Sequence, residues 1–444
     1  MSTKSILFVF ISCIAFSLHA QKYSNSPFSA QGIGETENVL NPTLGALGNT
    51  QSAIIDSTTL NYYNPSSYAS LGDGQPIFSV GLSVNSSRFY QGGLTSQQSL
   101  IGINHFAFGL SFAKRFGFCF GVRPYSSKGY EISNNSIALG DTVVNAYEGS
   151  GSYSNLFTGL SFKFINKEKH KFSIGMNASY LFGKMYDQQT TYLYSESIGG
   201  IQRTSLKING YKYDFGANYQ WLPTKSSVLT LAGTYSPKKH IAAESVSALI
   251  AATDFSNELS YDTLNYSALS TDLQLPSFYQ LGFKYDFINN AANKHLFDAT
   301  YHLILTGQFE LVNWTQYKGV YIEAGLLNSN RYSVGLQFAP HFDFFDRSKN
   351  VSWFSKVRYR VGFQYATLPW QMDNKQLFNK SITFGLGLPI VLQKSLSSFN
   401  VGCVLGEKTN NINTSLKEEF FNVTVGVTIT PAIYERWFRK GKID

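Results

Sequence analysis

The chain has 444 residues, of which 16% are aromatic and only 14% are charged, and its formal net charge is +8. Soluble domains carry roughly 25% charged residues, so this composition disfavours an ordinary soluble protein, although a large β-sandwich stays the alternative. Because the Lys and Arg residues are scattered along the chain, the positive charge indicates solvated loops rather than a nucleic-acid partner.

The first twenty residues are typical of a secretory signal peptide. Lys4 is followed by an apolar run from Ile6 to Leu18, and Ala20 precedes Gln21. This run is too short to span a membrane as a helix, and no later segment approaches the roughly 18 consecutive apolar residues that a membrane helix needs. We therefore expect residues 1–20 to direct export and to be removed.

From Gln75 onward, apolar residues alternate with small or polar ones. In residues 78–85 every second residue is apolar and the others are Ser, Gly or Asn. The same alternation recurs, with varying regularity, around residues 103–113, 116–122, 158–164, 172–182, 213–221, 229–237, 279–287, 297–303, 332–338, 357–365, 382–391, 399–405 and 420–430. The pattern predicts an all-β fold, a transmembrane antiparallel β-barrel of 14 strands with its apolar side chains facing lipid.

The links between these strands support the count. Short links follow the second, fourth, sixth, eighth and twelfth strands, and longer ones follow most odd-numbered strands. Short periplasmic turns alternate with long outer loops in such barrels. The link 341–353 is longer than a turn should be, and residues 319–327 could pass for a strand, but counting them would break the alternation. We expect the barrel at residues 76–430 and a periplasmic tail at 431–444.

Residues 44–71 follow neither a strand period nor a sustained helical stripe, and glycines interrupt their apolar residues. Near its end stands Asn64-Pro65, a turn dipeptide that marks either a plain turn or part of a gate. Since sixteen strands or more enclose an aqueous channel, a barrel of fourteen would leak if it were empty. We therefore expect residues 21–75 to form a hatch that plugs the lumen. The candidate gate residues are Leu44, Leu47, Ile54, Ile55, Asn64, Pro65 and Ser66.

The longest predicted outer loop, residues 238–273, contains apolar residues at helical spacing. Val246, Leu249 and Ile250 could share one helical face with Ala242 and Ala243. An apolar edge outside the membrane needs cover, so this face is either a landing site for a hydrophobic ligand or packing against neighbouring loops.

Several charged residues fall on the predicted lumen face. Arg358 and Arg360 project to the same side of one strand, and Asp214, Asp286 and Asp298 are available there. One interpretation is an internal salt-bridge network that holds the hatch and excludes water. The other is a pair of cations that meets a carboxylate head group through charge-assisted hydrogen bonds.

The chain carries no catalytic signature such as GxSxG, HExxH, a P-loop or paired CxxC motifs. The six histidines after the signal peptide are scattered without zinc-ligand spacing. Cys119 falls on a polar face and Cys403 on an apolar one, so we expect two free thiols. We predict neither an enzyme nor a cofactor or metal site.

The sequence at 32–34 (GIG) and at 44–71 resembles the hatch of the FadL/TodX family of outer-membrane transporters, whose signature is a Gly-rich run followed by Asn-Pro-Ala. Ser66 stands here in place of that Ala. Residues 328–340, 357–369, 382–390 and 416–444 are similar to the Bacteroidota branch of the family.

This resemblance implies a fourteen-stranded barrel in the cell outer membrane, with an N-terminal hatch. It also implies passive uptake of long-chain fatty acids or aromatic hydrocarbons along a hydrophobic path. Some Bacteroidota relatives act instead as partners in outer-membrane secretion or assembly complexes. The alternative is therefore a non-transporting barrel subunit of such a complex.

Overall fold

The computed structural model describes residues 26–431, except 37–40, 139, 196–197, 225, 256–259, 289–300, 320–324, 341–351, 391–396 and 413–414. The predicted signal peptide and C-terminal tail therefore lie outside the described residues, apart from Pro431. None of the helices in the described ranges is long and apolar enough to cross a membrane.

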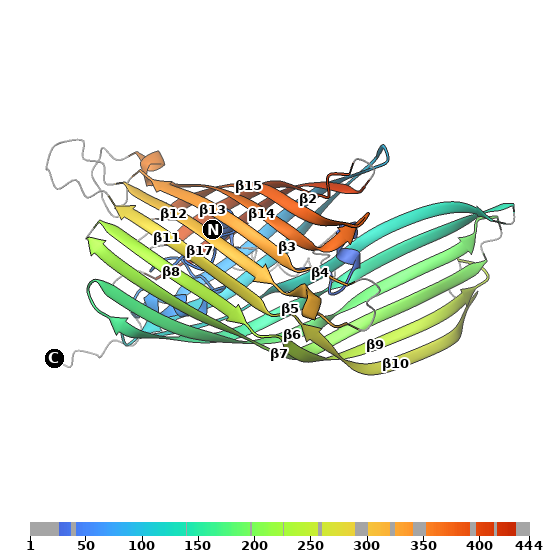
Figure 1. The fold of residues 1–444 in the computed structure, drawn as a ribbon, viewed down its shortest axis with the longest axis horizontal. Coiled ribbons are helices and arrows are strands. Elements are labelled where there is room, and N and C mark those ends of the chain that lie inside the picture. The colour runs from blue at the N-terminus through green and yellow to red at the C-terminus, as the bar shows by residue number, and fades with distance from the viewer. Residues whose placement is uncertain are drawn as a thin grey trace, which may run out of the picture.

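Fourteen antiparallel strands close into a barrel, as the sequence predicted (Figure 1). Neighbours pair in chain order, except that β8 pairs with β11 and β17 closes the ring on β2. The wall strands are β2 (Ile77–Gln91), β3 (Leu94–Phe112), β4 (Phe116–Ala138), β5 (Asp141–Asn166), β6 (His170–Leu193), β7 (Gly199–Thr224), β8 (Ser227–Ser236), β11 (Phe278–Ile288), β12 (His302–Val312), β13 (Ser329–Ala339), β14 (Arg358–Met372), β15 (Lys375–Ile390), β16 (Ser397–Thr409) and β17 (Lys417–Ile429).

One predicted strand is displaced along the chain. The alternation around 297–303 predicted a strand there, but β12 begins at His302 and pairs over its whole length with β11. Alternation continues past Leu303 through Leu305 and Phe309, so the period alone could not fix the ends. Pairing with β11 decides them, and residues 297–300 lie outside the described ranges.

The two faces of the wall differ as a barrel in lipid requires. On β2, Phe78, Val80, Leu82 and Val84 point outward and are exposed, whereas the serines between them are buried. Outward apolar rows recur on the other wall strands. This outer surface suits contact with the apolar part of a bilayer.

The two ends of the barrel differ in length. At one end, which we call the mouth, β2 begins and β17 stops, and the links β3–β4, β5–β6 and β7–β8 are short. At the other, extended end, β4 to β7 continue far beyond the remaining wall (Figure 1). The extension is possible because each of these four strands has 23 to 26 residues.

Two further strands enlarge the extension. β9 (Lys239–Ala252) pairs with the outer half of β7, and β10 (Tyr261–Leu275) pairs with β9. The helical face predicted for Val246, Leu249 and Ile250 is therefore wrong, because all three lie in β9. Their backbone groups pair with strands on both sides, and β-branched residues pack well on a pleated surface.

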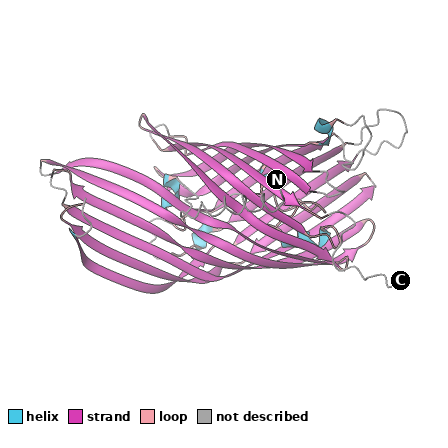
Figure 2. Ribbon diagram, turned by 180° about the vertical axis from the view of Figure 1, so that it is seen from behind, coloured by secondary structure: helices cyan, strands magenta, loops and turns pink. Residues whose placement is uncertain are grey.

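After β1 (Glu35–Thr36), residues 41–75 lie within the ring of strands, where Figure 2 shows short helices among the wall strands. We call residues 41–75 the inner segment. It contains α2 (Pro42–Gly45), which begins where Asn41 Oδ1 accepts the Thr43 amide at 2.9 Å. It also contains the 3-10 helix η2 (Pro65–Ser70), which Asn64 caps in the same way. Asn side chains at these caps satisfy amides that the helices leave open.

Candidate functional site

The inner segment contacts glycines of the barrel wall. A Cβ atom at Gly362 would lie 2.6 Å from Gly48 Cα, and one at Gly335 would lie 2.5 Å from the Leu47 carbonyl oxygen. On the opposite wall, a Cβ at Gly175 would lie 2.5 Å from the backbone of Pro65. These wall positions leave no room even for a methyl group, so the segment is seated against the wall itself.

Polar side chains of the wall also bind the backbone of the inner segment. Gln308 Oε1 accepts the amides of Gln51 and Ser52 at 2.7 and 2.9 Å. Thr383 Oγ1 accepts the Gly48 amide at 2.8 Å. Asn218 Nδ2 donates to the Ser66 carbonyl at 2.9 Å. Because irregular backbone inside a barrel must find partners for its polar groups, these wall side chains fix the path of the segment.

A second obstruction fills the lumen nearer the extended end, and no sequence pattern predicted it. Phe28 and Ile33 are buried in one cluster with inward side chains of the wall, such as Trp370 on β14, and with Trp314. Trp314 belongs to the 3-10 helix η4 (Trp314–Gln316), and Phe28 to η1 (Pro27–Ala30). Residues 26–36, which we call the upper strap, therefore cross the lumen on the side of the inner segment that faces the extended end.

Buried ionic contacts anchor the upper strap to one side of the barrel. Lys408 on β16 pairs with Glu418 on β17, Nζ to Oε2 at 3.2 Å, and with Glu35 of the strap. Ser26 Oγ donates to the same Glu418 oxygen at 2.6 Å. On the other side, Glu35 and Thr36 pair as β1 with Ser127 and Ser126 of β4. The strap is thus tied to both walls.

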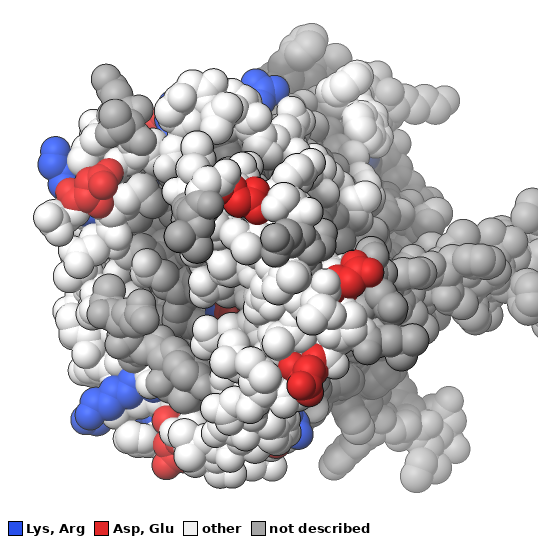
Figure 3. Space-filling view, turned by 90° about the vertical axis from the view of Figure 1, so that its right-hand side faces the viewer, with Lys and Arg blue, Asp and Glu red and all other residues white. Residues whose placement is uncertain are grey.

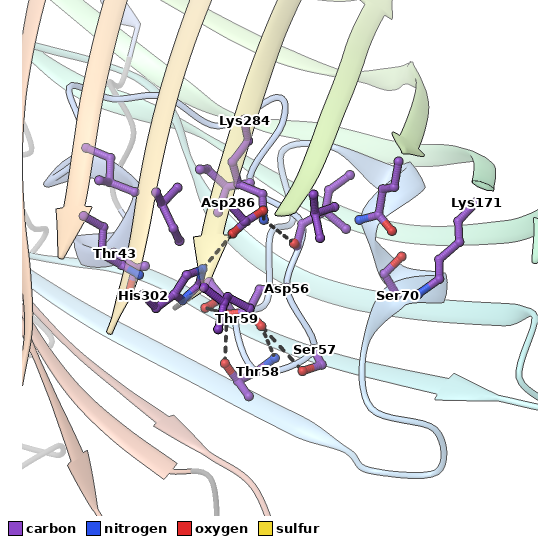
Figure 4. Close-up of a pocket in the computed structure, with 18 of the residues that line it drawn as sticks. Thr43, Asp56, Ser57, Thr58, Thr59, Ser70, Lys171, Lys284, Asp286 and His302 are labelled. Atoms are coloured by element: carbon purple, nitrogen blue, oxygen red, sulfur yellow. Dashed lines mark hydrogen bonds and ion pairs between the residues drawn. The ribbon is translucent and has the colours of Figure 1, made fainter. Parts of the chain in front are cut away.

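A cavity of about 650 Å³ opens between the inner segment and the wall near the mouth (Figure 4). We call it the mouth cavity. Asp56 of the inner segment faces Arg358 of β14 at 4.0 Å, and Lys284 of β11 lies 2.8 Å from Asp286. His302 lies 3.0 Å from the other oxygen of Asp286.

The charge of Asp56 is maintained by its neighbours. Burial acts to raise the pKa of Asp56, but the positive charges of Arg358 and Lys284 and hydrogen bonds from Thr58 outweigh it and hold the pKa below its ordinary value. The carboxylate therefore stays ionised in the mouth cavity and remains paired with Arg358.

A model of the BamG family matches residues 1–444, the whole length of the chain. The chain belongs to the BamG family. No curated protein is detectably similar in sequence.

Solved structures share the fold of this BamG-family barrel at low sequence identity. The toluene transporter TodX of Pseudomonas putida is 12% identical, with a TM-score of 0.53 over 90% of this chain and 99% of that one. A FadL homologue of Pseudomonas aeruginosa is 12% identical, with a TM-score of 0.54 over 90% and 100%. The CymD monoaromatic hydrocarbon channel is 10% identical, with a TM-score of 0.52 over 88% and 98%. These likenesses establish the FadL-like fold; the Bacteroidota branch stays a prediction.

The candidate gate residues of this BamG-family chain lie in the lumen in two groups. Leu44, Leu47 and Ile54 form one buried cluster, and Leu47, Ile54 and Ile55 also line the mouth cavity. Asn64, Pro65 and Ser66 lie against the wall at Gly175, Gly216 and Asn218. Their role as a gate stays a prediction.

The predicted lumen charges do not form a single network. Arg358 and Asp286 line the mouth cavity, whereas Arg360 lies beyond it and donates to Gln337 and Asn400 at 2.7 and 3.1 Å. Asp214 pairs elsewhere with Lys212, and Asp298 lies outside the described residues. Strand stagger separates them, because residues on one face of different strands stand at different heights.

The sequence pattern does not reveal two residues whose ion pairs hold the lumen segments, namely Asp56 and Lys408. Asp56 sits in irregular chain, where no period assigns it a direction. Lys408 lies on an inward row of β16, and the three consecutive charged residues 417–419 on the next strand are the available signal for its pairing.

Proposed function

We propose that this chain is a closed, non-transporting barrel subunit of the outer membrane that serves as a partner in a secretion or assembly complex. The observation that carries the proposal is the seating of the inner segment against the glycines of the wall. Where these glycines meet the segment there is no clearance for a methyl group, so no apolar path runs between segment and wall at those positions.

The upper strap supports the same conclusion. A hydrophobic molecule that entered from the extended end would meet the cluster of Phe28, Ile33 and Trp314 before it reached the inner segment. Displacing the strap would break its buried polar contacts, from Glu35 to Lys408 and from Ser26 to Glu418. Breaking such a contact is costly, so both obstructions favour a lumen that stays shut.

The extension offers a surface for a protein partner. β10 pairs with β9 on one side, and along its other side the described part of the chain supplies a single bridge, from Gln274 to Lys318. Leu264, Tyr266 and Leu269 on β10 are each more than half exposed. Figure 3 shows that this end of the molecule is mostly uncharged, with separate acidic and basic groups. A free strand edge with exposed apolar side chains suits the addition of a partner strand.

Purification of the tagged protein from mild detergent extracts of its own cells tests this function. We expect a stoichiometric partner to co-purify with the wild type. Leu264→Lys combined with Tyr266→Lys on the free edge should reduce its recovery, because charges block strand addition. Leu94→Lys, at an exposed position at the start of β3, is the matched control and should leave recovery unchanged. Purification of the barrel alone would argue against the proposal.

A second candidate function is passive passage of hydrophobic compounds, and one feature of the wall favours it. β3 and β4 pair only near the mouth, where Phe106–Phe112 of β3 lies beside Phe116–Val122 of β4. Their outer halves do not pair with each other. β1 of the upper strap pairs with β4 just beyond, at Ser126 and Ser127, so a lateral route for an apolar molecule to the bilayer would run between β1 and β3. Uptake assays with a fatty acid and toluene test this candidate. If a deletion strain takes up both as fast as its parent, passage through this barrel is excluded.

A further inference from the structure

Two lysines at the mouth cavity have no ion-pair partner in the part of the chain that the structure describes. Lys163 on β5 and Lys171 on β6 both line the cavity. Lys163 is only 9% exposed. Neither ammonium group makes a hydrogen bond or an ion pair with any described residue, although every carboxylate lining the cavity has a cationic neighbour within 4.0 Å.

The other charges of the cavity nearly cancel, which leaves these two in excess. Asp286 is paired with Lys284 and faces His302, and Asp56 faces Arg358. Asp73 attracts Lys163 from a distance, but its Oδ1 accepts the Lys114 amide at 3.0 Å. An ammonium group removed from water without a partner is unfavourable, so an anion that reached Lys163 would gain a strong, charge-assisted contact.

The rest of the lining suits an anion with an apolar stem. Hydroxyl groups also line the cavity, and Ser70 lies near Lys171 in Figure 4. Apolar side chains complete the wall of the cavity, namely Leu47, Ile54, Leu222, Val228, Ile288 and Ile304. The volume, about 650 Å³, falls within the roughly 300–1,000 Å³ of small-molecule sites.

We propose that the mouth cavity binds a small carboxylate or phosphate anion on a short apolar stem, with the anionic group held between Lys163 and Lys171 and the stem against Ile54 and Val228. The site is separate from the free edge of β10 and does not require passage through the lumen. It therefore goes beyond the partner function. The same chemistry is found in free organic acids and phosphates and in anionic lipid head groups.

Equilibrium binding of radiolabelled octyl phosphate tests the site, with the full-length protein in nanodiscs of phosphatidylcholine and empty nanodiscs subtracted. We expect saturable binding of one molecule per barrel, and no saturable binding of octyl glucoside, which has the same stem without a charge. Lys163→Met combined with Lys171→Met should weaken binding about tenfold or more, since hydrogen bonds to charged groups are strong. Lys169→Met, in the turn between the same two strands but outside the cavity, should bind as the wild type does.

Competition distinguishes the sources of the anion. Displacement of octyl phosphate by phosphatidic acid in the disc supports a lipid head group, and displacement by inorganic phosphate supports a free anion. Lys171→Met alone, at the less buried of the two positions, checks the result if the double variant does not fold. Absence of saturable binding to the wild type would overturn the proposal, as would equal binding by the wild type and both lysine variants. Binding of an acidic peptide without any binding of octyl phosphate would overturn it in favour of a protein segment.

Discussion

Lys284 connects the barrel wall to the inner segment: its Nζ donates to the carbonyl oxygen of Ile55 at 2.9 Å. The same ammonium group lies 2.8 Å from Asp286. One wall residue thus fixes the backbone of the inner segment and neutralises a buried carboxylate, which couples the position of the segment to the charge balance of the mouth.

Replacement of Lys284 should loosen the inner segment. In Lys284→Met, Ile55 loses its donor and Asp286 keeps only His302, so we expect a loss of about 1–3 kcal/mol in stability. Faster proteolysis within residues 41–75 would show that the inner segment is loosened, and a lower unfolding temperature in detergent would show the loss of stability. Lys207→Met provides the control, because its contact with Glu244 at 3.5 Å is exposed and should be worth little. Equal effects of the two substitutions would contradict the assignment.

A methyl group on the wall should displace the inner segment. In Gly362→Ala the added Cβ meets the backbone of Leu47 and Gly48, so overpacking should destabilise the barrel by about 1–3 kcal/mol. Faster proteolysis within residues 41–75 should accompany this loss, because the segment is pushed off the wall. Gly200→Ala is the matched control, since its Cβ would meet only the Ile250 carbonyl at an ordinary 3.6 Å. Unchanged stability and an unchanged rate of proteolysis in Gly362→Ala would show that the segment is not held tightly at this point.

Removal of the Lys408 charge should release the upper strap. Lys408→Met leaves Glu418 buried without its cation, so we expect the free energy of unfolding to fall by about 3–5 kcal/mol. Adding Glu418→Gln should recover part of that loss, because it removes the unpaired charge. Unfolding followed by the shift in gel mobility of the heated barrel measures both effects. Lys417→Met, which breaks only exposed pairs with Glu407 and Glu419, should change little.

The contact between Arg358 and Asp56 should stabilise the fold in a pH-dependent way. The pKa of Asp56 in the folded state lies below its ordinary 3.8, so the stability that it contributes is present above that value and is lost as the pH falls through the folded-state pKa. Arg358→Gln should therefore lower the unfolding temperature at pH 7. The difference in unfolding temperature between the variant and the wild type should narrow below about pH 4. If this difference in unfolding temperature stayed constant from about pH 7 to about pH 3, the contact between Arg358 and Asp56 would not be its cause.

The sequence by itself determined the wall. Alternation along segments such as 78–85 is a local property, because successive side chains of a strand point to opposite faces. It therefore predicted the number of barrel strands, their apolar outer face and the irregular stretch that contains Asn64 and Pro65. The two-residue period also placed Cys119, which is buried, and Cys403 on opposite faces, and both thiols are free.

Only the tertiary structure decided which of these residues meet. β9 is a strand because β7 and β10 lie on either side of it, whereas its apolar residues fit helical spacing as well. The separation of Arg358 from Asp214, and the pairing of Lys408 with Glu35, depend on the stagger of strands far apart in the chain. A two-residue period assigns a side chain to a face but not to a height along the barrel, so contacts across the lumen follow from the closed ring alone.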